Sequence, residues 1–273
     1  MSHSLLVLQQ RLRHEFRDQL ELIAFLEAEP TIEIICKVIL TEQQQHQAHQ
    51  FARQLHQSGK PDDPHVVVVS GLDEQAQNAP ASANPRRLQV QEIQFSELCA
   101  FRAEGQRPAI LSASAVLICE DTQEIILQRR AADVATHANC LHIIGGAFHP
   151  GQDRSNGQAS LLATIQREVK EETGITIPLQ QLQQLQQAWP SSRPLSLVKE
   201  KTTGFVQCAA IGISVSAQAL EQLQENWEGN LLRVGWHELP DLLKDPSWVP
   251  SGKAHVMTWL AINGWLQLPS PIH

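Results

Sequence analysis

Three glutamates at helical spacing follow a glycine pair within residues 145–175, and this stretch constrains the chain more than any other. Glu168, Glu171 and Glu172 occupy positions i, i+3 and i+4, so a helix brings their side chains onto one face. Like charges at this spacing repel each other by roughly a few tenths of a kcal/mol per pair. Hard cations such as Mg²⁺ and Mn²⁺ prefer carboxylate oxygens, and Gly145-Gly146 lets the backbone approach a ligand closely. The stretch therefore predicts a helix that holds a divalent cation.

The apolar residues of the same helix predict the side that it buries. They form a stripe next to the glutamates rather than opposite them: Leu161, Leu162, Ile165 and Val169. Ser155 or Ser160 suits the N-cap position, and Gly174 suits the residue that ends the helix. Arg167 precedes Glu171 by four residues, which is the less stabilising order, so an orienting role explains Arg167 better.

Residues 167–175, Arg-Glu-Val-Lys-Glu-Glu-Thr-Gly-Ile, meet every constrained position in the second half of the Nudix box, and the stretch resembles that family. The box is Gly, five residues, Glu, seven residues, then Arg-Glu-aliphatic-x-Glu-Glu-x-Gly-aliphatic. Counted from Gly146, the position expected to hold Glu is Gln152, and fourteen residues separate it from Arg167. The loop therefore carries a Glu→Gln change and an insertion of about seven residues, roughly residues 153–159. A neutral Gln152 cannot form an ion pair with Arg167.

The segment before the box is also similar to Nudix proteins, so the resemblance extends from about residue 107. Residues 110–119 and 124–128 predict a hairpin, and residues 140–144 predict a strand that leads into the glycine pair. Arg129-Arg130 directly follow the hairpin. They either clamp a phosphate group or lie exposed at the end of the strand, and both interpretations stay open.

The resemblance implies an α/β fold over residues 107–273, a Nudix-type α/β/α sandwich with a mixed β-sheet. It also implies a metal-dependent hydrolase that cleaves the pyrophosphate bond of a nucleoside diphosphate linked to another moiety. The ligands that it assigns to Mg²⁺ or Mn²⁺ are Glu168, Glu171, Glu172 and a backbone carbonyl of Gly145 or Gly146. The residues that it assigns to catalysis within the box are Arg167, Glu171 and Glu172.

The general base in this family is a box glutamate or a glutamate on a loop before a late strand. Here that loop offers Glu225 and Glu228, and we take Glu228 as the candidate. Trp189 either stacks on a nucleobase or packs in the core. The predicted substrate-binding residues are Arg129, Arg130 and Trp189.

A second hypothesis is a Nudix-like sensor that binds a nucleotide without hydrolysing it. The intact set of three glutamates favours the enzyme. The change at Gln152 and the insertion favour the sensor.

Residues 1–106 predict a small, separate α/β domain to which we assign no chemistry. The expected order is a helix over residues 16–29, a strand over residues 31–40, a helix that begins at Thr41, and strands over residues 65–70 and 87–95. Gln44 is the capping-box partner of Thr41. Three histidines of that helix form either a metal site or, as we favour in the absence of nearby acids and thiols, an exposed polar face: His46, His49 and His56.

The composition limits the partners and the location. A net charge of −8 without a Lys/Arg run disfavours binding to nucleic acid. The resemblance to Nudix proteins implies a small-molecule nucleotide as the partner. No apolar run is long enough to cross a bilayer, so a cytoplasmic protein is expected. The five cysteines are odd in number and lack CxxC spacing, which predicts reduced thiols. The choice between a monomer and a homodimer stays open.

Overall fold

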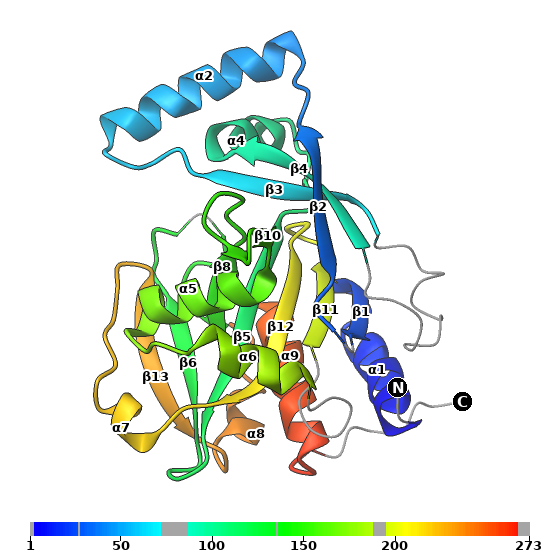
Figure 1. Ribbon diagram of the computed structural model, residues 1–273, viewed down its shortest axis with the longest axis vertical. Helices are drawn as coiled ribbons and strands as arrows, with labels where there is room; N and C mark the ends of the chain where they lie inside the picture. Colours follow the sequence, from blue (N-terminus) through cyan, green and yellow to red (C-terminus); the bar gives the residue numbers. More distant parts are fainter. Residues whose placement is uncertain (1–2, 27, 72–86, 135, 188–194, 267–273) are drawn as a thin grey trace.

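A computed structural model describes residues 3–26, 28–71, 87–134, 136–187 and 195–266 (Figure 1). Within these residues, one mixed sheet has the strand order β1-β11-β12-β5-β6-β13, with β7 added to β6 and β8 added to β5. Its strands are β1 (Leu20–Leu26), β5 (Leu111–Cys119), β6 (Glu124–Arg130), β7 (Leu141–His142), β8 (Ile144–Ala147), β11 (Leu195–Glu200), β12 (Val206–Ser214) and β13 (Gly229–Gly235). The β12–β5 pair is parallel and the other pairs are antiparallel.

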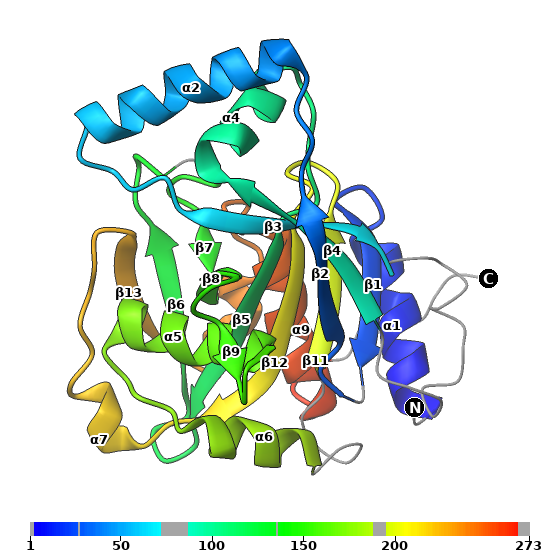
Figure 2. The same cartoon turned by 45° about the horizontal axis from the view of Figure 1, so that its top comes forward.

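Helices cover both faces of this sheet, which confirms the predicted α/β/α sandwich (Figures 1 and 2). One face carries α5 (Leu161–Thr173) and α6 (Leu179–Gln187), and the other carries α1 (His3–Glu15) and α9 (Pro250–Ile262). The short helices α7 (Ala217–Leu220) and α8 (Leu239–Leu242) flank β13 along the chain. All nine residues of β5 are buried, because its side chains alternate between the two cores.

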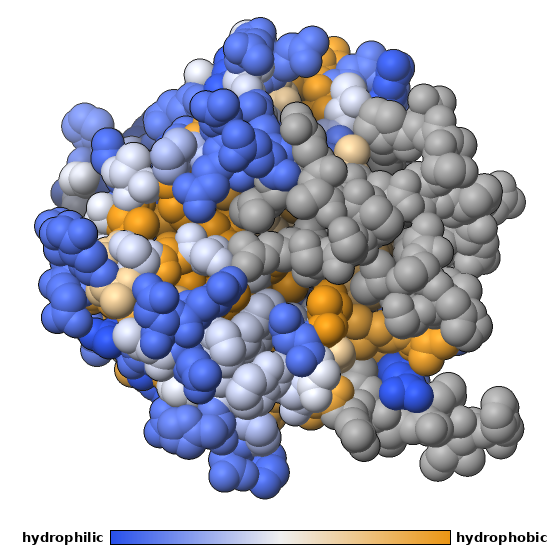
Figure 3. Space-filling model, turned by 60° about the horizontal axis from the view of Figure 1, so that its bottom comes forward, coloured by the Kyte–Doolittle hydropathy of each residue, from blue (hydrophilic) through white to orange (hydrophobic). Residues whose placement is uncertain are grey.

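The core on the α9 side extends to the lower end of the molecule. Trp236 contacts Trp259 and Trp265 edge to face, with ring centroids 5.0 and 5.5 Å apart. Trp265 is 47% exposed, and hydrophobic side chains reach the surface between hydrophilic ones at this end (Figure 3).

The first strand belongs to the main sheet rather than to a separate domain. The prediction of a helix over residues 16–29 is wrong, because α1 ends at Glu15 and β1 pairs with β11. Phe25 joins the core on the α9 side, whereas Ala24 and Leu26 join the core on the α5 side. Side chains of this segment alternate between the two cores, as they do in a strand. Because the segment packs between two layers, this alternation outweighs the helical spacing of its apolar residues. The expected boundary at residue 106 therefore does not separate the two sheets.

A second, three-stranded sheet with the order β2-β4-β3 forms what we call the upper lobe, together with α2 and α4 (Figure 1). Its elements are β2 (Thr31–Lys37), α2 (Glu42–Gln57), β3 (Pro64–Ser70), β4 (Arg87–Gln94) and α4 (Phe95–Ala103). The predicted capping box of Thr41 and Gln44 is present. The lobe joins the main sheet where the Val68 amide donates to the Ala109 carbonyl at 2.8 Å.

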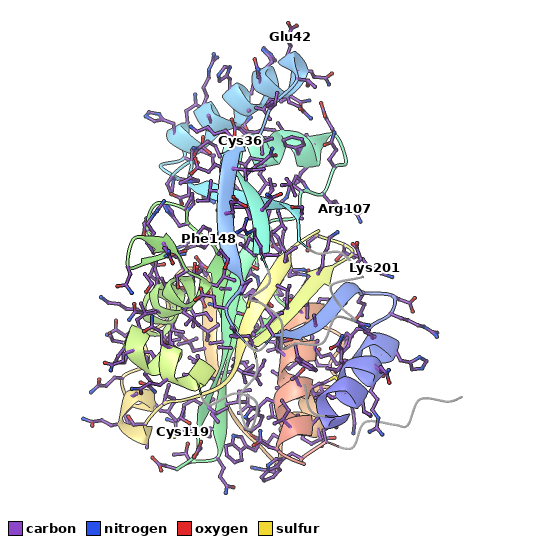
Figure 4. All side chains as sticks on the ribbon, turned by 45° about the vertical axis from the view of Figure 1, so that its right-hand side comes forward. Cys36, Glu42, Arg107, Cys119, Phe148 and Lys201 are labelled. Carbon is purple, nitrogen blue, oxygen red and sulfur yellow. The ribbon has the colours of Figure 1, made fainter. Side chains whose placement is uncertain are left out.

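Labelled side chains in Figure 4 show how the two parts meet. Phe148 is fully buried where the loop after β8 approaches the upper lobe. The Arg107 guanidinium donates to the Lys201 carbonyl at 3.2 Å on the other side of the contact between the upper lobe and the main sheet.

The five cysteines are free thiols, and Cys36 and Cys119 lie at opposite ends of the molecule. No helix in the described ranges has the length and apolar character needed to cross a membrane.

Candidate active site

Helix α5 is built as its sequence predicts. Ser160 is the N-cap and accepts a hydrogen bond from the Ala163 amide at 3.2 Å. Gly174 ends the helix with a left-handed φ of 76°, which glycine adopts without strain. The predicted apolar stripe is buried: Leu161, Leu162, Ile165 and Val169. The glutamates therefore lie at the edge of the helix face that packs on the sheet.

The glycine pair is required by close contacts on both sides of β8. A Cβ at Gly145 would lie 2.4 Å from the Cα of Ser114 on the paired strand β5. A Cβ at Gly146 would lie 2.4 Å from Oε1 of Glu168. The absence of side chains thus allows α5 to bring a carboxylate against the strand backbone.

Glu172 is the most deeply placed carboxylate of the three, with 1% of its surface exposed. Its Oε2 accepts the Gly145 amide at 2.9 Å, and its Oε1 accepts the Gln128 side-chain amide at 3.2 Å. Burial raises the pKa of Glu172 well above its ordinary value, and the charges of Glu168 and Glu228 raise it further. An uncompensated charge is therefore unfavourable here.

Glu168 and Glu171 share one nitrogen of Arg167, whose Nη1 donates to them at 2.7 and 2.9 Å. Glu168 is 7% exposed, and burial raises its pKa to about 7 although Arg167 opposes the shift. The Glu171 side chain is 54% exposed. The three glutamates thus differ in their surroundings, from buried Glu172 to exposed Glu171.

Arg167 forms a two-point ion pair with Asp153, a residue that the sequence analysis did not select. Its Nε and Nη2 donate to the two carboxylate oxygens of Asp153 at 2.8 and 2.9 Å, and Nη2 also donates to the Ala147 carbonyl at 2.9 Å. Burial by itself lowers the pKa of Arg167, but Asp153, Glu168 and Glu171 outweigh burial and raise it.

The loop therefore supplies an acidic partner for Arg167, although the position expected to hold Glu is the neutral Gln152. Gln152 is exposed, and the next residue, Asp153, is 1% exposed and also accepts the His149 amide at 2.7 Å. The acidic residue thus lies one position after the expected one. An aspartate directly after Gln152 was the feature of the sequence that could have indicated it. The remaining insertion forms a short hairpin of β9 (Arg154–Ser155) and β10 (Gln158–Ala159). Its turn is Asn156-Gly157, with φ of 51° and 79°, as a two-residue type I′ turn requires.

The two loop glutamates before β13 lie in different surroundings. Glu228 lies near the buried carboxylates, and its charge raises the pKa of both Glu168 and Glu172. Its carbonyl accepts the Ala131 amide at 2.7 Å, which ties the loop to the end of β6. Glu225 instead accepts the Leu231 amide at 3.0 Å and is exposed. Gln128, which holds Glu172, is a second residue that the sequence analysis missed.

The predicted substrate-binding arginines have different partners. Arg129 contacts the Asp245 carboxylate at 3.9 Å and donates to the Asn139 carbonyl at 3.0 Å. Arg130 donates from Nε to the Thr136 carbonyl at 3.2 Å. Trp189 lies outside the described residues.

The histidines of α2 lie far from this group of residues, at the top of the molecule in Figure 1. The imidazole of His46 is within 2.9 Å of the Gln50 side chain on the same helix, and both His46 and His49 are exposed. A metal site at these histidines stays without support from the geometry.

Comparison with known proteins agrees with this geometry. The family profile of the NUDIX domain matches residues 109–260, more than half of the chain. This profile match, together with a mixed sheet whose glycine pair faces an acidic helix, places the chain in the class of Nudix-type pyrophosphohydrolases. The chain is a member of the NUDIX family. No curated protein matches it.

Solved structures with similarity to the chain are remote in sequence. The MutT protein from Methanosarcina mazei Go1 is 20% identical, with a TM-score of 0.41, over 57% of this chain and 96% of that chain. The NUDIX domain of Shewanella oneidensis NrtR, complexed with ADP ribose, is 16% identical, with a TM-score of 0.40, over 62% and 98%. A bifunctional NMN adenylyltransferase/ADP ribose pyrophosphatase from Francisella tularensis is 13% identical, with a TM-score of 0.43, over 57% and 42%.

Proposed function

We propose that this chain hydrolyses the pyrophosphate bond of a nucleoside diphosphate linked to another moiety, with Mg²⁺ or Mn²⁺ held by Glu168, Glu171 and Glu172. The observation that carries the proposal is the burial of two neighbouring carboxylates, Glu168 and Glu172, with Glu228 close enough for its charge to act on both. Arg167 contacts Glu168 but is shared with Asp153 and Glu171, and within the described residues no cationic side chain pairs with Glu172. A divalent cation would balance the remaining negative charge.

The donor set fits a hard cation in its chemistry. Carboxylate oxygens beside backbone carbonyls are the ligands that Mg²⁺ and Mn²⁺ prefer, and we assign a carbonyl of Gly145 or Gly146 to the set. Within the described residues, no three acidic, histidine or cysteine side chains are arranged so that they could hold a metal ion. In this arrangement Arg167 donates to oxygens of both Glu168 and Glu171. When bound, the cation would neutralise diphosphate charge and lower the pKa of a water molecule.

The residues around the cation position would orient the metal ligands, accept a proton and bind the phosphate groups. Arg167, which Asp153 holds at two points, would orient Glu168 and Glu171. Glu228 would accept the proton of the attacking water, with Glu171 and Glu172 as the alternatives. The Nε of Arg130 donates to the Thr136 carbonyl, and within the described residues its two terminal nitrogens make no hydrogen bond, so Arg130 would bind a phosphate group through them. Arg129 and Trp189 stay predictions for substrate binding.

The decisive experiment incubates the full chain with Mg²⁺ or Mn²⁺ and a panel of ADP-ribose, NADH, dinucleoside polyphosphates and nucleoside triphosphates. Metal-dependent turnover that Glu171→Gln abolishes supports the enzyme, with Glu225→Gln as the matched control. Nucleotide binding without turnover of any substrate supports the sensor hypothesis instead. That hypothesis has lost one argument, because Asp153 supplies an acid next to Gln152. A homodimer and a cytoplasmic location stay predictions.

A further inference from the structure

The first turn of α5 obtains half of its hydrogen-bond partners from a distant part of the chain. The Ala163 amide donates to the Ser160 side chain at 3.2 Å, and the Thr164 amide donates to the Ser160 carbonyl at 3.3 Å. The amides of Leu161 and Leu162 both donate to Oε1 of Glu29, 132 and 133 residues earlier in the sequence. The Ser160 amide donates to the Asp153 carbonyl at 3.0 Å. The four amides that the helix leaves unpaired at its start, those of residues 160–163, are thus all satisfied.

Glu29 also supplies a charge that the helix itself lacks. The first turn of α5 contains no acidic residue, although the partial positive charge of a helix N-terminus favours one there. Burial raises the pKa of Glu29, and hydrogen bonds from Leu162, Ser160 and Leu161 oppose that shift. The carboxylate is therefore held by several donors of the helix start.

The position of Glu29 is fixed from both sides by strands. It lies between β1, which pairs with β11 of the main sheet, and β2, the edge strand of the upper lobe. The hairpin strand β10 packs against β2 and leads directly into Ser160. The inserted hairpin and the connection between β1 and β2 thus meet at the start of α5.

We propose that Glu29 is a positioning residue for the hydrolase site, which holds α5 and its glutamate row against the sheet through the first turn of the helix. This inference rests on the function proposed above. Glu168 follows Leu161 by seven residues, about two helical turns. A tilt of the helix start would therefore move the carboxylates relative to the Gly145 amide, and misplacement by about 1 Å can cost about 100-fold in rate.

The test compares Glu29→Ala and Glu29→Gln in the full chain with Glu21→Ala. Glu21 is a matched control because it lies on the preceding strand, is exposed and contacts Lys199 at 2.9 Å. Amide hydrogen exchange is measured along α5, and Mn²⁺ affinity and steady-state rates are measured on the same samples. For Glu29→Ala we expect about tenfold faster exchange that reaches residues 168–172, Mn²⁺ binding weakened about tenfold, and lower kcat with little change in KM for the nucleotide. Glu29→Gln should fall between wild type and Glu29→Ala.

Unchanged exchange at Leu161 and Leu162 would overturn the proposal, and so would faster exchange confined to the first turn with Mn²⁺ affinity intact. The latter result would make Glu29 a local cap only. If the wild-type chain turns over no substrate or binds no Mn²⁺, the proposed function fails. The role of Glu29 is then still decided by whether faster amide exchange in Glu29→Ala extends from the first turn of α5 to residues 168–172.

Discussion

Asp153 and Arg167 meet through two parallel hydrogen bonds, from Nε at 2.8 Å and from Nη2 at 2.9 Å, on a carboxylate that is 1% exposed. This pair joins the irregular loop of the box to its regular helix. The same guanidinium contacts Glu168 and Glu171 through Nη1. The loop therefore influences the glutamate row through one side chain.

The Asp153–Arg167 pair leads to the first prediction. Asp153→Asn keeps an oxygen for the His149 amide but removes the charge, so we expect the free energy of unfolding to fall by about 3 kcal/mol and kcat to fall with it. Chemical denaturation and steady-state kinetics measure the two effects. Gln152→Ala is the control, because Gln152 is exposed and should leave both values unchanged. Wild-type stability in Asp153→Asn would contradict the role assigned to the pair.

The contact between Gly146 and Glu168 leads to the second prediction. Alanine at position 146 would place its Cβ 2.4–2.7 Å from the carboxylate atoms of Glu168, which must then shift. We expect a loss of about 100-fold in kcat, because a displacement near 1 Å has that effect on a catalytic geometry. Gly151→Ala, whose Cβ would approach only the His149 ring at 3.2 Å, serves as the control. Equal rates in the two variants would show that the position of Glu168 does not limit turnover.

The two loop glutamates provide a matched pair for the third prediction. Glu228→Gln should lower kcat by about 10²- to 10⁴-fold if Glu228 is the general base, with little change in KM. Stability should not fall, because the substitution removes a charge that raises the pKa of Glu172. Glu225→Gln should keep wild-type kinetics. A larger loss in Glu225→Gln than in Glu228→Gln would exchange the two assignments.

The fourth prediction concerns His255 in α9, which is 0% exposed and whose ring nitrogens have no hydrogen-bond partner in the described residues. Burial lowers its pKa from 6.5 to about 3, with His142 adding to this shift and Glu200 opposing it. The unfolded chain therefore binds more protons than the folded chain between these values, and stability falls as pH falls through 6.5 toward 3. His255 contributes at most about 3 kcal/mol of this loss between pH 7 and pH 4.

Denaturation midpoints at pH 7 and pH 4 measure this effect. His255→Leu should flatten the pH dependence, and the exposed His49→Leu should not. An unchanged slope in His255→Leu would show that the imidazole does not stay neutral in the folded protein.

Sequence patterns predicted the parts of the site that are local. The cap at Ser160, the end at Gly174 and the buried stripe of α5 depend on residues within one helix, and all three are confirmed. The mixed sheet was expected from the resemblance to Nudix proteins. Apolar runs of strand length predicted individual strands that are covered on both faces, such as β5. The second half of the box is a contiguous motif and therefore identified the family.

Contacts between distant residues were not predictable in the same way. The ion pair of Asp153 depends on how a hairpin folds back, which shifts the acid by one residue from the expected position. Glu29 and Leu161 of α5 are 132 residues apart in the sequence, and no periodic pattern of residues predicts their contact. Helical spacing around Phe16 suggested a helix where pairing with β11 gives a strand, because tertiary packing outweighs local propensity.

The pairing of β1 with β11 also has a consequence for synthesis. Leu26 aligns with Leu195, so about 170 residues must be translated before the first strand meets its neighbour. At ribosomal rates of roughly 5–20 residues per second, that wait is on the order of ten seconds. During this time the apolar side chains of α1 and β1 stay exposed, because the strands against which they pack have not yet been translated. The N-terminal segment is therefore where we expect a chaperone to engage the nascent chain.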